Sequence, residues 1–379
     1  MYSNPFFISP ATAVPDLGSD TTLNHMRAVG LNTGNMLFSR ALQKVLAPTS
    51  GTPVSSANPK DLLKVHKNHD SIVLAAANWL QPRTDLGDRA AVIEQTDLPC
   101  FVIGIGAQSG SVTRIPELTE GTKRFLKVVS ERSAAISVRG AFTAEVLAHY
   151  GIHNVEITGC PSLLMMDPVP PKLNGSATPP TRISISGSRG LPSEAQLTAK
   201  SPTHRLSRLF AKLIQTDDVD FVAQAEIPEI NLILEGITRD EPHREEWLRF
   251  AEQYYGMPLD QLTPLLRKRM KVFFNLPDWL DYLGSRDFVI GTRLHGAIAG
   301  LLAGTPSVLI VHDSRTREMA ENMAIPAIEA SRITDSIPYA EIYQEANFDR
   351  FNLGYMTYYH RFRAFFERNR LNHALNPNA

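Results

Sequence analysis

Residues 287–311 read DFVIGTRLHGAIAGLLAGTPSVLIV, and this stretch decides the fold. Residues 287–290 predict a short buried strand, residues 294–303 a helix of small and apolar side chains, and residues 307–311 a second buried strand. Two strands joined by a crossover helix form a parallel βαβ unit. The stretch therefore predicts an α/β protein with a parallel sheet.

The same alternation of buried strands and helices continues over most of the chain. Short apolar runs without polar alternation are typical of parallel strands that are covered on both faces. The first half predicts strands at 71–77, 100–105, 135–138 and 155–157, and helices at 123–132 and 143–150. The second half predicts strands at 182–186, 219–224 and 271–274, and helices at 204–215 and 277–283.

The chain has 379 residues, which is too long for one ordinary core. Residues 167–180, DPVPPKLNGSATPP, carry five prolines and cannot continue a helix or a central strand. We interpret this segment as a linker. The sequence thus predicts two Rossmann-like lobes that face a cleft, over residues 1–170 and 171–345, and a helical tail over 346–379 that packs back on the first lobe.

Composition excludes several classes of protein. Basic and acidic residues number 38 and 39, which gives a formal net charge of −1 and no global positive field for nucleic acid. Cys100 and Cys160 are the only cysteines, so a disulfide scaffold and a thiolate metal site are excluded. No secretory signal and no apolar run of about 18 residues is readable. We expect a cytoplasmic protein, either free or bound peripherally to the inner face of the membrane through the basic residues 267–271.

The strongest candidate site is Gly291-Thr292-Arg293-Leu294-His295-Gly296, which follows a strand and opens a helix. The free N–H groups of such a helix and its dipole favour an anion. Arg293 adds a planar fork for carboxylate or phosphate, and His295 can exchange a proton near neutral pH. The structural alternative is that Arg293 pairs with Asp287 and that His295 only caps the helix.

Two other strand ends carry polar side chains. Arg139, in Ser137-Val138-Arg139-Gly140, offers a cation from the first lobe, with a structural salt bridge as the alternative. Residues 104–110, GIGAQSG, do not have the spacing of a dinucleotide loop, so we expect Gln108 to face a polar ligand there and no nicotinamide to bind. Cys160 has no evident base beside it in the sequence and is interpreted as a buried, inert thiol.

These motifs together resemble the polysaccharide pyruvyl transferase family. Residues 290–296 and 304–306 are similar to the signature of the family, residues 137–140, 151–152 and 159–162 to its middle block, and residues 32–35 to its opening turn. The resemblance covers about residues 30 to 330. Two positions depart from the family pattern: Asn35 and Cys160 stand where many members have an aspartate.

The resemblance implies a fold of the GT-B type and a reaction. Family members move the enolpyruvyl unit of phosphoenolpyruvate onto two hydroxyls of a sugar, which forms a pyruvate ketal and releases phosphate. Phosphoenolpyruvate is then a co-substrate, with no further cofactor and no metal. The other partner is a glycan or a lipid-linked saccharide, in the setting of exopolysaccharide biosynthesis.

Roles for individual residues follow from that reaction. Arg139 and Arg293 would hold the donor from opposite lobes, with Thr292 and the backbone of Leu294 beside its phosphate, and His295 would protonate C3 as general acid. The base stays open among Asp278, Asp313 and Glu318. Polar residues assigned to the acceptor side are Asn35, Asn78, Gln108 and Arg189.

Two alternatives of other classes remain open. A nucleotide-sugar-dependent glycosyltransferase would share the two-lobed fold, because a fold does not fix a function, and Glu318 would then hold the ribose. A catalytically inactive sugar-binding relative would be expected to lose Arg139, Arg293 or His295, and all three are present.

Overall fold

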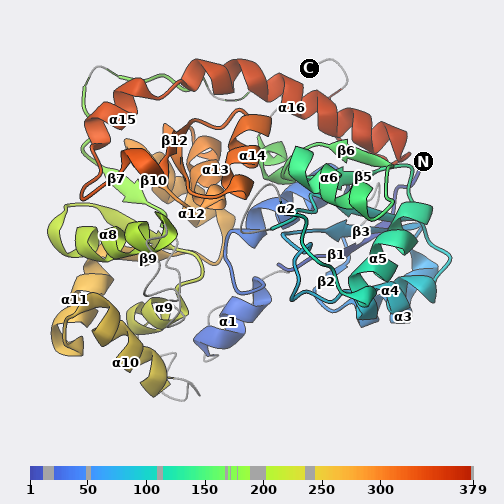
Figure 1. The fold of residues 1–379 in the computed structure, drawn as a ribbon, viewed down its shortest axis with the longest axis horizontal. Helices are drawn as coiled ribbons and strands as arrows, with labels where there is room; N and C mark the ends of the chain where they lie inside the picture. The colour runs from blue at the N-terminus through green and yellow to red at the C-terminus, as the bar shows by residue number, and fades with distance from the viewer. Residues whose placement is uncertain are drawn as a thin grey trace.

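The computed structural model describes residues 1–11, 21–47, 53–108, 114–166, 170, 172–176, 178–187, 202–234 and 244–376, which two parallel sheets organise (Figure 1). The first sheet has the strand order β2-β1-β3-β4. Its strands are β1 (Pro5–Ile8), β2 (Ser55–Ser56), β3 (Ser71–Ala75) and β4 (Cys100–Ile103). A further parallel pair, β5 (Ile136–Val138) and β6 (Val155–Ile157), continues this sheet beyond β4, because Ile105 forms a bridge with Val138.

Helices cover both faces of the first sheet, as the apolar strands require. One face packs with α4 (Gly87–Glu94), α5 (Glu120–Glu131) and α6 (Ala141–His149) in a core of its own. The opposite face packs with α2 (Asn35–Val45) and a 3-10 turn over Pro161–Met165, and this core is continuous with that of the second lobe. The short α3 (Leu62–Val65) lies at the edge near β2.

The second sheet is also parallel throughout, with the order β12-β11-β10-β7-β8-β9. Its strands are β7 (Ile183–Ile185), β8 (Asp220–Ala223), β9 (Met270–Val272), β10 (Phe288–Gly291), β11 (Ser307–Val311) and β12 (Ala327–Glu329). The helices around it are α8 (Pro202–Thr216), α12 (Leu276–Gly284), α13 (Leu294–Leu302), α14 (Ser314–Asn322) and α15 (Tyr339–Glu345).

A group of helices extends the second lobe at the β9 end of its sheet. It consists of α9 (Ile227–Ile233), α10 (Arg244–Tyr255) and α11 (Leu259–Arg269). Helix α1 (Thr22–Ala28), which follows β1 of the first lobe, packs against α9, and the His25 ring lies 5.7 Å from the Phe274 ring. Helix α1 therefore contacts the second lobe, although the strand before it belongs to the first (Figure 1).

The last helix, α16 (Phe348–Arg368), lies along both lobes (Figure 1). Aromatic residues recur every three or four positions on its buried face, which makes one continuous apolar stripe. The Tyr358 hydroxyl donates to the Cys160 carbonyl at 2.7 Å, and Asn369 Oδ1 accepts from the backbone N–H groups of Ala134 and Ala135. The chain end thus packs on the first lobe, where Tyr2 and Leu371 form a bridge.

The predicted α/β class with two Rossmann-like lobes facing a cleft is confirmed. The three elements of residues 287–311 appear as β10, α13 and β11. The domain boundaries at 170 and 345 stay predictions. Strand β1 and the helices α10 and α11 were not predicted; α11 contains Pro264 in its interior, which the sequence alone does not favour. No described helix is both long and apolar enough to span a bilayer.

Candidate functional site

A polar cleft of about 310 Å³ lies between the two lobes. Its walls come from the carboxyl ends of parallel strands and from the segments that follow them, which is where ligands bind in open α/β sheets. The first lobe contributes Gly30, Asn32, Asn35, Ala77, Asn78, Gln81, Gln108 and Arg139, and the second contributes Gln224, Thr292, Arg293, Leu294, His295, Arg315, Thr316 and Met319.

Arg139 brings a buried positive charge to the cleft from the first lobe. Its Nε donates to the Gly104 carbonyl at 2.8 Å, and its Nη1 donates to Asn78 Oδ1 at 2.7 Å. Gly106 leaves the space for this side chain, since a Cβ there would lie 2.8 Å from Arg139 Cδ. Burial lowers the pKa of Arg139, and the charge of Arg315 lowers it further. Arg139 forms no salt bridge among the described residues, so its charge is open to an anionic ligand.

Arg293 lies at the start of α13 and pairs with Glu226, not with Asp287. The Glu226 carboxylate is buried and accepts a hydrogen bond from Arg293 Nη2. It also accepts from the backbone N–H groups of Gln224 and Ala225, at 2.8 and 3.0 Å. Burial acts to raise the pKa of Glu226, but the Arg293 charge and these hydrogen bonds outweigh it and hold the pKa below its ordinary value. The expected alternative partner, Asp287, binds Arg182 instead.

Arg315 is a third cation in the cleft that sequence reasoning missed. It lies in the first turn of α14, and its Nη2 is 3.4 Å from Asp313 Oδ2. The segment that carries it follows β11, so it has the same strand–turn–helix pattern that identified Arg293. That pattern was the available signal. Arg139, Arg293 and Arg315 all line one cleft.

His295 lies in the first turn of α13, half-buried in the cleft wall between the two lobes. Its ring centroid is 5.5 Å from that of Phe38, and its Nε2 is 3.6 Å from Cys160 Sγ. Gly34 provides the space on the Nδ1 side, where a Cβ would lie 2.7 Å from the ring nitrogen. Burial and the charges of Arg139, Arg315 and Arg293 lower the pKa of His295 to about 3. The imidazole is therefore neutral near pH 7 as long as no anion occupies the cleft.

The sequence did not reveal that Cys160 contacts His295. Its thiol is fully buried, lies 3.1 Å from Ser162 Oγ, and faces His295 from the first lobe. The expectation that no base stands beside Cys160 is wrong, because the two residues are 135 positions apart and meet only across the lobe interface. The thiol thus contacts one of the two ring nitrogens, Nε2.

Amide side chains line the first-lobe wall of the cleft. Asn35 lines it and donates from Nδ2 to the Val29 carbonyl at 2.9 Å, Asn78 lines it and accepts from Arg139, and Gln108 is exposed in it. Arg189 lies outside the described residues. Thr292 and Leu294 line the opposite wall with Arg293. The described lining contains no carboxylate, so it offers cations, amides and one imidazole.

The three carboxylates proposed as the base lie elsewhere. Asp278 is in the first turn of α12 and bonds with Asn275. Asp313 caps α14 by accepting from the Thr316 N–H at 2.7 Å. Glu318 accepts from the Phe142 N–H at 2.6 Å in the other lobe. None of the three is among the residues that line the cleft.

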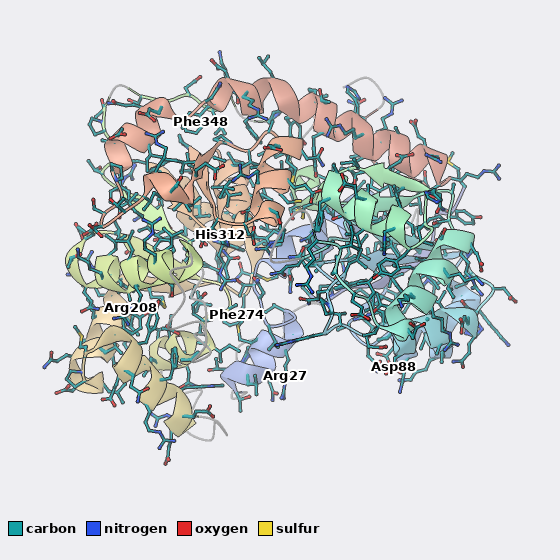
Figure 2. All side chains as sticks on the ribbon, viewed as in Figure 1. Arg27, Asp88, Arg208, Phe274, His312 and Phe348 are labelled. Atoms are coloured by element: carbon teal, nitrogen blue, oxygen red, sulfur yellow. The ribbon has the colours of Figure 1, made fainter. Side chains whose placement is uncertain are left out.

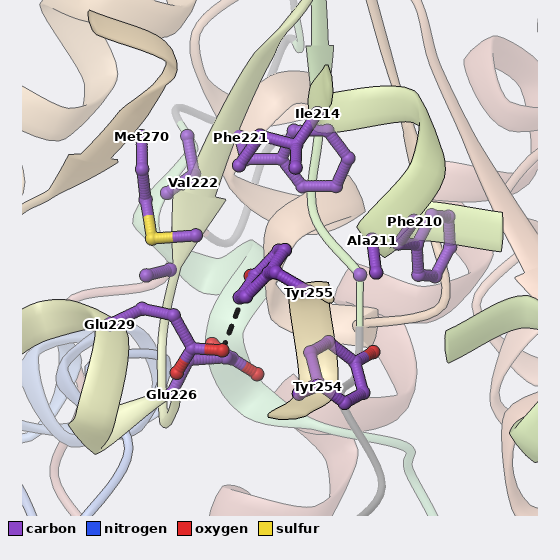
Figure 3. A pocket seen from close by; sticks show the side chains of 12 residues that line it. Phe210, Ala211, Ile214, Phe221, Val222, Glu226, Glu229, Tyr254, Tyr255 and Met270 are labelled. Atoms are coloured by element: carbon purple, nitrogen blue, oxygen red, sulfur yellow. Dashed lines mark hydrogen bonds between the residues drawn. The ribbon is translucent and has the colours of Figure 1, made fainter. Parts of the chain in front are cut away.

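A second, much smaller cavity lies behind Glu226, and Figure 3 shows its lining. It holds about 30 Å³ between aromatic and aliphatic side chains, and the Tyr255 hydroxyl donates to Glu229 there at 3.2 Å (Figure 3). A volume of this size is about that of one water molecule. It has no room for a nucleobase or a sugar ring, so the polar cleft is the candidate site.

Comparison with known proteins adds a family and loose structural likenesses. The family model of polysaccharide pyruvyl transferases matches residues 32–314. No curated protein matches the sequence. A UDP-GlcNAc 2-epimerase of Methanocaldococcus jannaschii is similar in structure, with 12% identity, a TM-score of 0.43, and coverage of 93% of this chain and 83% of that one. The wall teichoic acid polymerase TagF is 12% identical, with a TM-score of 0.37 and coverage of 97% of this chain and 84% of that one. The UDP-N-acetylglucosamine 2-epimerase of Rickettsia bellii is 10% identical, with a TM-score of 0.39 and coverage of 82% of this chain and 76% of that one.

Proposed function

The chain belongs to the polysaccharide pyruvyl transferase family, and we propose that it transfers the enolpyruvyl unit of phosphoenolpyruvate to a sugar of a polysaccharide or its precursor. Two sugar hydroxyls and C2 of the donor form a cyclic pyruvate ketal, and phosphate leaves. The convergence of Arg139, Arg293, Arg315 and His295 in one cleft carries this proposal. The proposed reaction implies that the protein acts in the cytoplasm, where phosphoenolpyruvate is made, either free or bound peripherally to the membrane.

The cations suit the charge of the donor. Phosphoenolpyruvate carries a carboxylate and a phosphate, and guanidinium groups bind both with paired, charge-assisted hydrogen bonds. The Glu226 carboxylate already pairs with Arg293, and Asp313 lies near Arg315, so Arg139 supplies the cation without a paired carboxylate. The N-terminus of α13 adds the positive end of a helix dipole at Leu294.

His295 is the proposed general acid, and its environment makes donor binding and protonation interdependent. In the empty cleft burial, and after it the charges of the three arginines, favour the neutral imidazole. A bound donor brings negative charge that offsets those cations, so the pKa of His295 rises and the ring takes up a proton. The protonated ring then faces C3 of the donor.

His295 alone can supply the proton that C3 needs and take one back at the end of the reaction. In the first step a sugar hydroxyl oxygen bonds to C2, its proton moves to the donor phosphate, and His295 gives its proton to C3 to make the methyl group. In the second step the C2–O bond to phosphate breaks, the second hydroxyl oxygen bonds to C2, and its proton returns to the neutral imidazole. The absence of a carboxylate from the described lining favours His295 in both roles.

The first test is calorimetric titration of the purified protein with phosphoenolpyruvate and with a panel of UDP- and GDP-sugars. We expect phosphoenolpyruvate to bind and Arg139→Ala to weaken that binding. Binding of a nucleotide sugar with no response to phosphoenolpyruvate would instead identify a glycosyltransferase and overturn the proposal.

A further inference from the structure

Helix α14 of the second lobe presents one face to both the cleft and the first lobe. Arg315, Glu318 and Asn322 are three and four residues apart, which places them along one side of a helix. Arg315 lines the cleft at the start of the helix, and Asn322 ends it. The same helix therefore carries a cation of the site and residues that lie beyond it.

Glu318 caps a helix that belongs to the other lobe. Its Oε1 accepts from the Phe142 N–H at 2.6 Å, in the first turn of α6. The residue at the N-cap of α6 is Gly140, which has no side chain to fill this role. A carboxylate at a helix N-terminus also interacts favourably with the helix dipole. The second lobe thus supplies the cap that the sequence of the first lobe lacks.

Gly140 makes this contact sterically possible. A Cβ at this position would lie 2.0 Å from Glu318 Cγ and 2.1 Å from its Cδ. The backbone of Gly140 is extended, with φ −178°, so its conformation would accept other residues. The close approach of Glu318, and not the local backbone conformation, therefore explains why residue 140 is a glycine.

Asn322 reaches the backbone of Arg139 itself. Its Nδ2 donates to the Arg139 carbonyl at 3.0 Å, and Arg361 of α16 donates to the Asn322 carbonyl at 3.1 Å and to its side-chain oxygen. Two hydrogen bonds from one second-lobe helix therefore hold the residues on either side of Gly140. The guanidinium of Arg139 is fixed within the first lobe by Gly104 and Asn78.

We propose that Glu318 and Asn322 are positioning residues that set Arg139 of the first lobe at a fixed distance from Arg293 and Arg315 of the second. Neither residue touches the reacting atoms in this arrangement. The proposal assigns a structural role in the site to Glu318, in place of the base or the ribose-binding acid expected from the sequence. Its consequence for donor affinity rests on the proposed function, whereas its consequence for lobe geometry does not.

The contact needs an acceptor oxygen at residue 318 and does not need a negative charge. Burial raises the pKa of Glu318, although the N–H groups of Phe142 and Thr143 oppose the shift, and both the protonated and the ionised carboxyl group can accept a hydrogen bond. Glu318→Gln therefore keeps the contact, and Glu318→Ala removes it. Glu318→Gln is the matched control, because it loses the charge but keeps the acceptor and the packing on Gly140, both of which Glu318→Ala removes.

Lobe geometry can be read directly by spin labels. Asp88 on α4 and Arg208 on α8 are exposed residues on opposite lobes (Figure 2), and both native cysteines are buried, so Asp88→Cys and Arg208→Cys create one pair of labelling sites. We expect one narrow distance distribution in the parent protein and in Glu318→Gln. Glu318→Ala should broaden or shift it and weaken phosphoenolpyruvate binding about tenfold, because the two halves of the cation cluster are no longer held together.

Gly140→Ala tests the same contact from the other side. It should reproduce the effects of Glu318→Ala, and the double variant Gly140→Ala/Glu318→Ala should be no worse than either single one, since both remove one interaction. Should Glu318→Ala fail to fold, Asn322→Ala removes the hydrogen bond to the Arg139 carbonyl, together with the side-chain bond to Arg361, without altering a charge, and should change affinity in the same direction.

An unchanged label distance together with unchanged donor affinity in Glu318→Ala and Asn322→Ala would overturn the proposal. So would additive losses in the double variant. If the parent protein does not bind phosphoenolpyruvate at all, the proposed function fails, while the label distances and the stability of the five variants still decide whether α14 sets the lobe geometry.

Discussion

Removal of Arg293 should produce two separable losses, one of donor affinity and one of stability. Arg293 lines the cleft and brings a positive charge to the buried Glu226 carboxylate. A lost charge-assisted pair with the donor is worth about 1.5–3 kcal/mol. That corresponds to a donor affinity weakened by about 10- to 150-fold.

The stability loss comes from Glu226. Breaking a buried ion pair by removing one partner typically costs about 3–5 kcal/mol, because the other charge stays buried without compensation. In the parent protein Glu226 has a lowered pKa, so its pair contributes stability above the unfolded pKa and loses it as pH falls through the folded pKa. In Arg293→Ala the charge that most strongly opposes the effect of burial is lost, so the pKa of Glu226 rises and the variant should become relatively more stable as pH falls.

Adding Glu226→Gln separates the two effects. Arg293→Ala/Glu226→Gln leaves no charge at residue 226, so it should regain most of the lost stability without regaining donor affinity. Chemical denaturation at pH 7 and pH 5, with calorimetric titration of phosphoenolpyruvate, measures both quantities. If the double variant recovers donor binding along with stability, Arg293 acts only through the fold and the reasoning about the cleft is refuted.

Three other predictions concern the acid, its neighbour and the last helix. Binding of phosphoenolpyruvate at pH 7 should take up about one proton, seen in buffers of different ionisation enthalpy, and His295→Ala should abolish this uptake and lower turnover by about 10²–10⁴-fold while donor binding persists. Cys160→Asp should raise the pKa of His295 from its value of about 3, because a carboxylate then faces Nε2; an unchanged NMR titration of that ring would contradict the contact. Phe362→Ala should destabilise the fold by about 3–5 kcal/mol in denaturant unfolding, since this ring is fully buried on the inner face of α16, and a loss below about 1 kcal/mol would be inconsistent with that packing.

Local pattern was enough to predict most strands and their order along the chain. The unit β10–α13–β11 agrees with the prediction because each strand is a short apolar run bounded by turn residues, and a parallel strand must be followed by a crossover. The same logic located Arg139 and Arg293, which both follow strands. Applied to the end of β11 it would also have found Arg315.

Contacts between side chains that are distant in sequence could not be predicted in this way. Asp287 is six residues from Arg293 in sequence, but the four residues of β10 separate them by about 13 Å, so the pair expected from proximity does not form. The contacts that do form join residues far apart in the chain: Glu226 with Arg293, Cys160 with His295, and Glu318 with Phe142. Nothing in periodicity or spacing encodes which side chains face one another once two sheets pack together.

The most direct test of the proposed reaction is mass spectrometry of a sugar panel incubated with the protein and phosphoenolpyruvate in D₂O. The account predicts phosphate release together with one sugar that gains the mass of a pyruvate ketal, and whose new methyl group carries one deuteron from solvent. Sugars that all keep their mass, with no phosphate released, would contradict it.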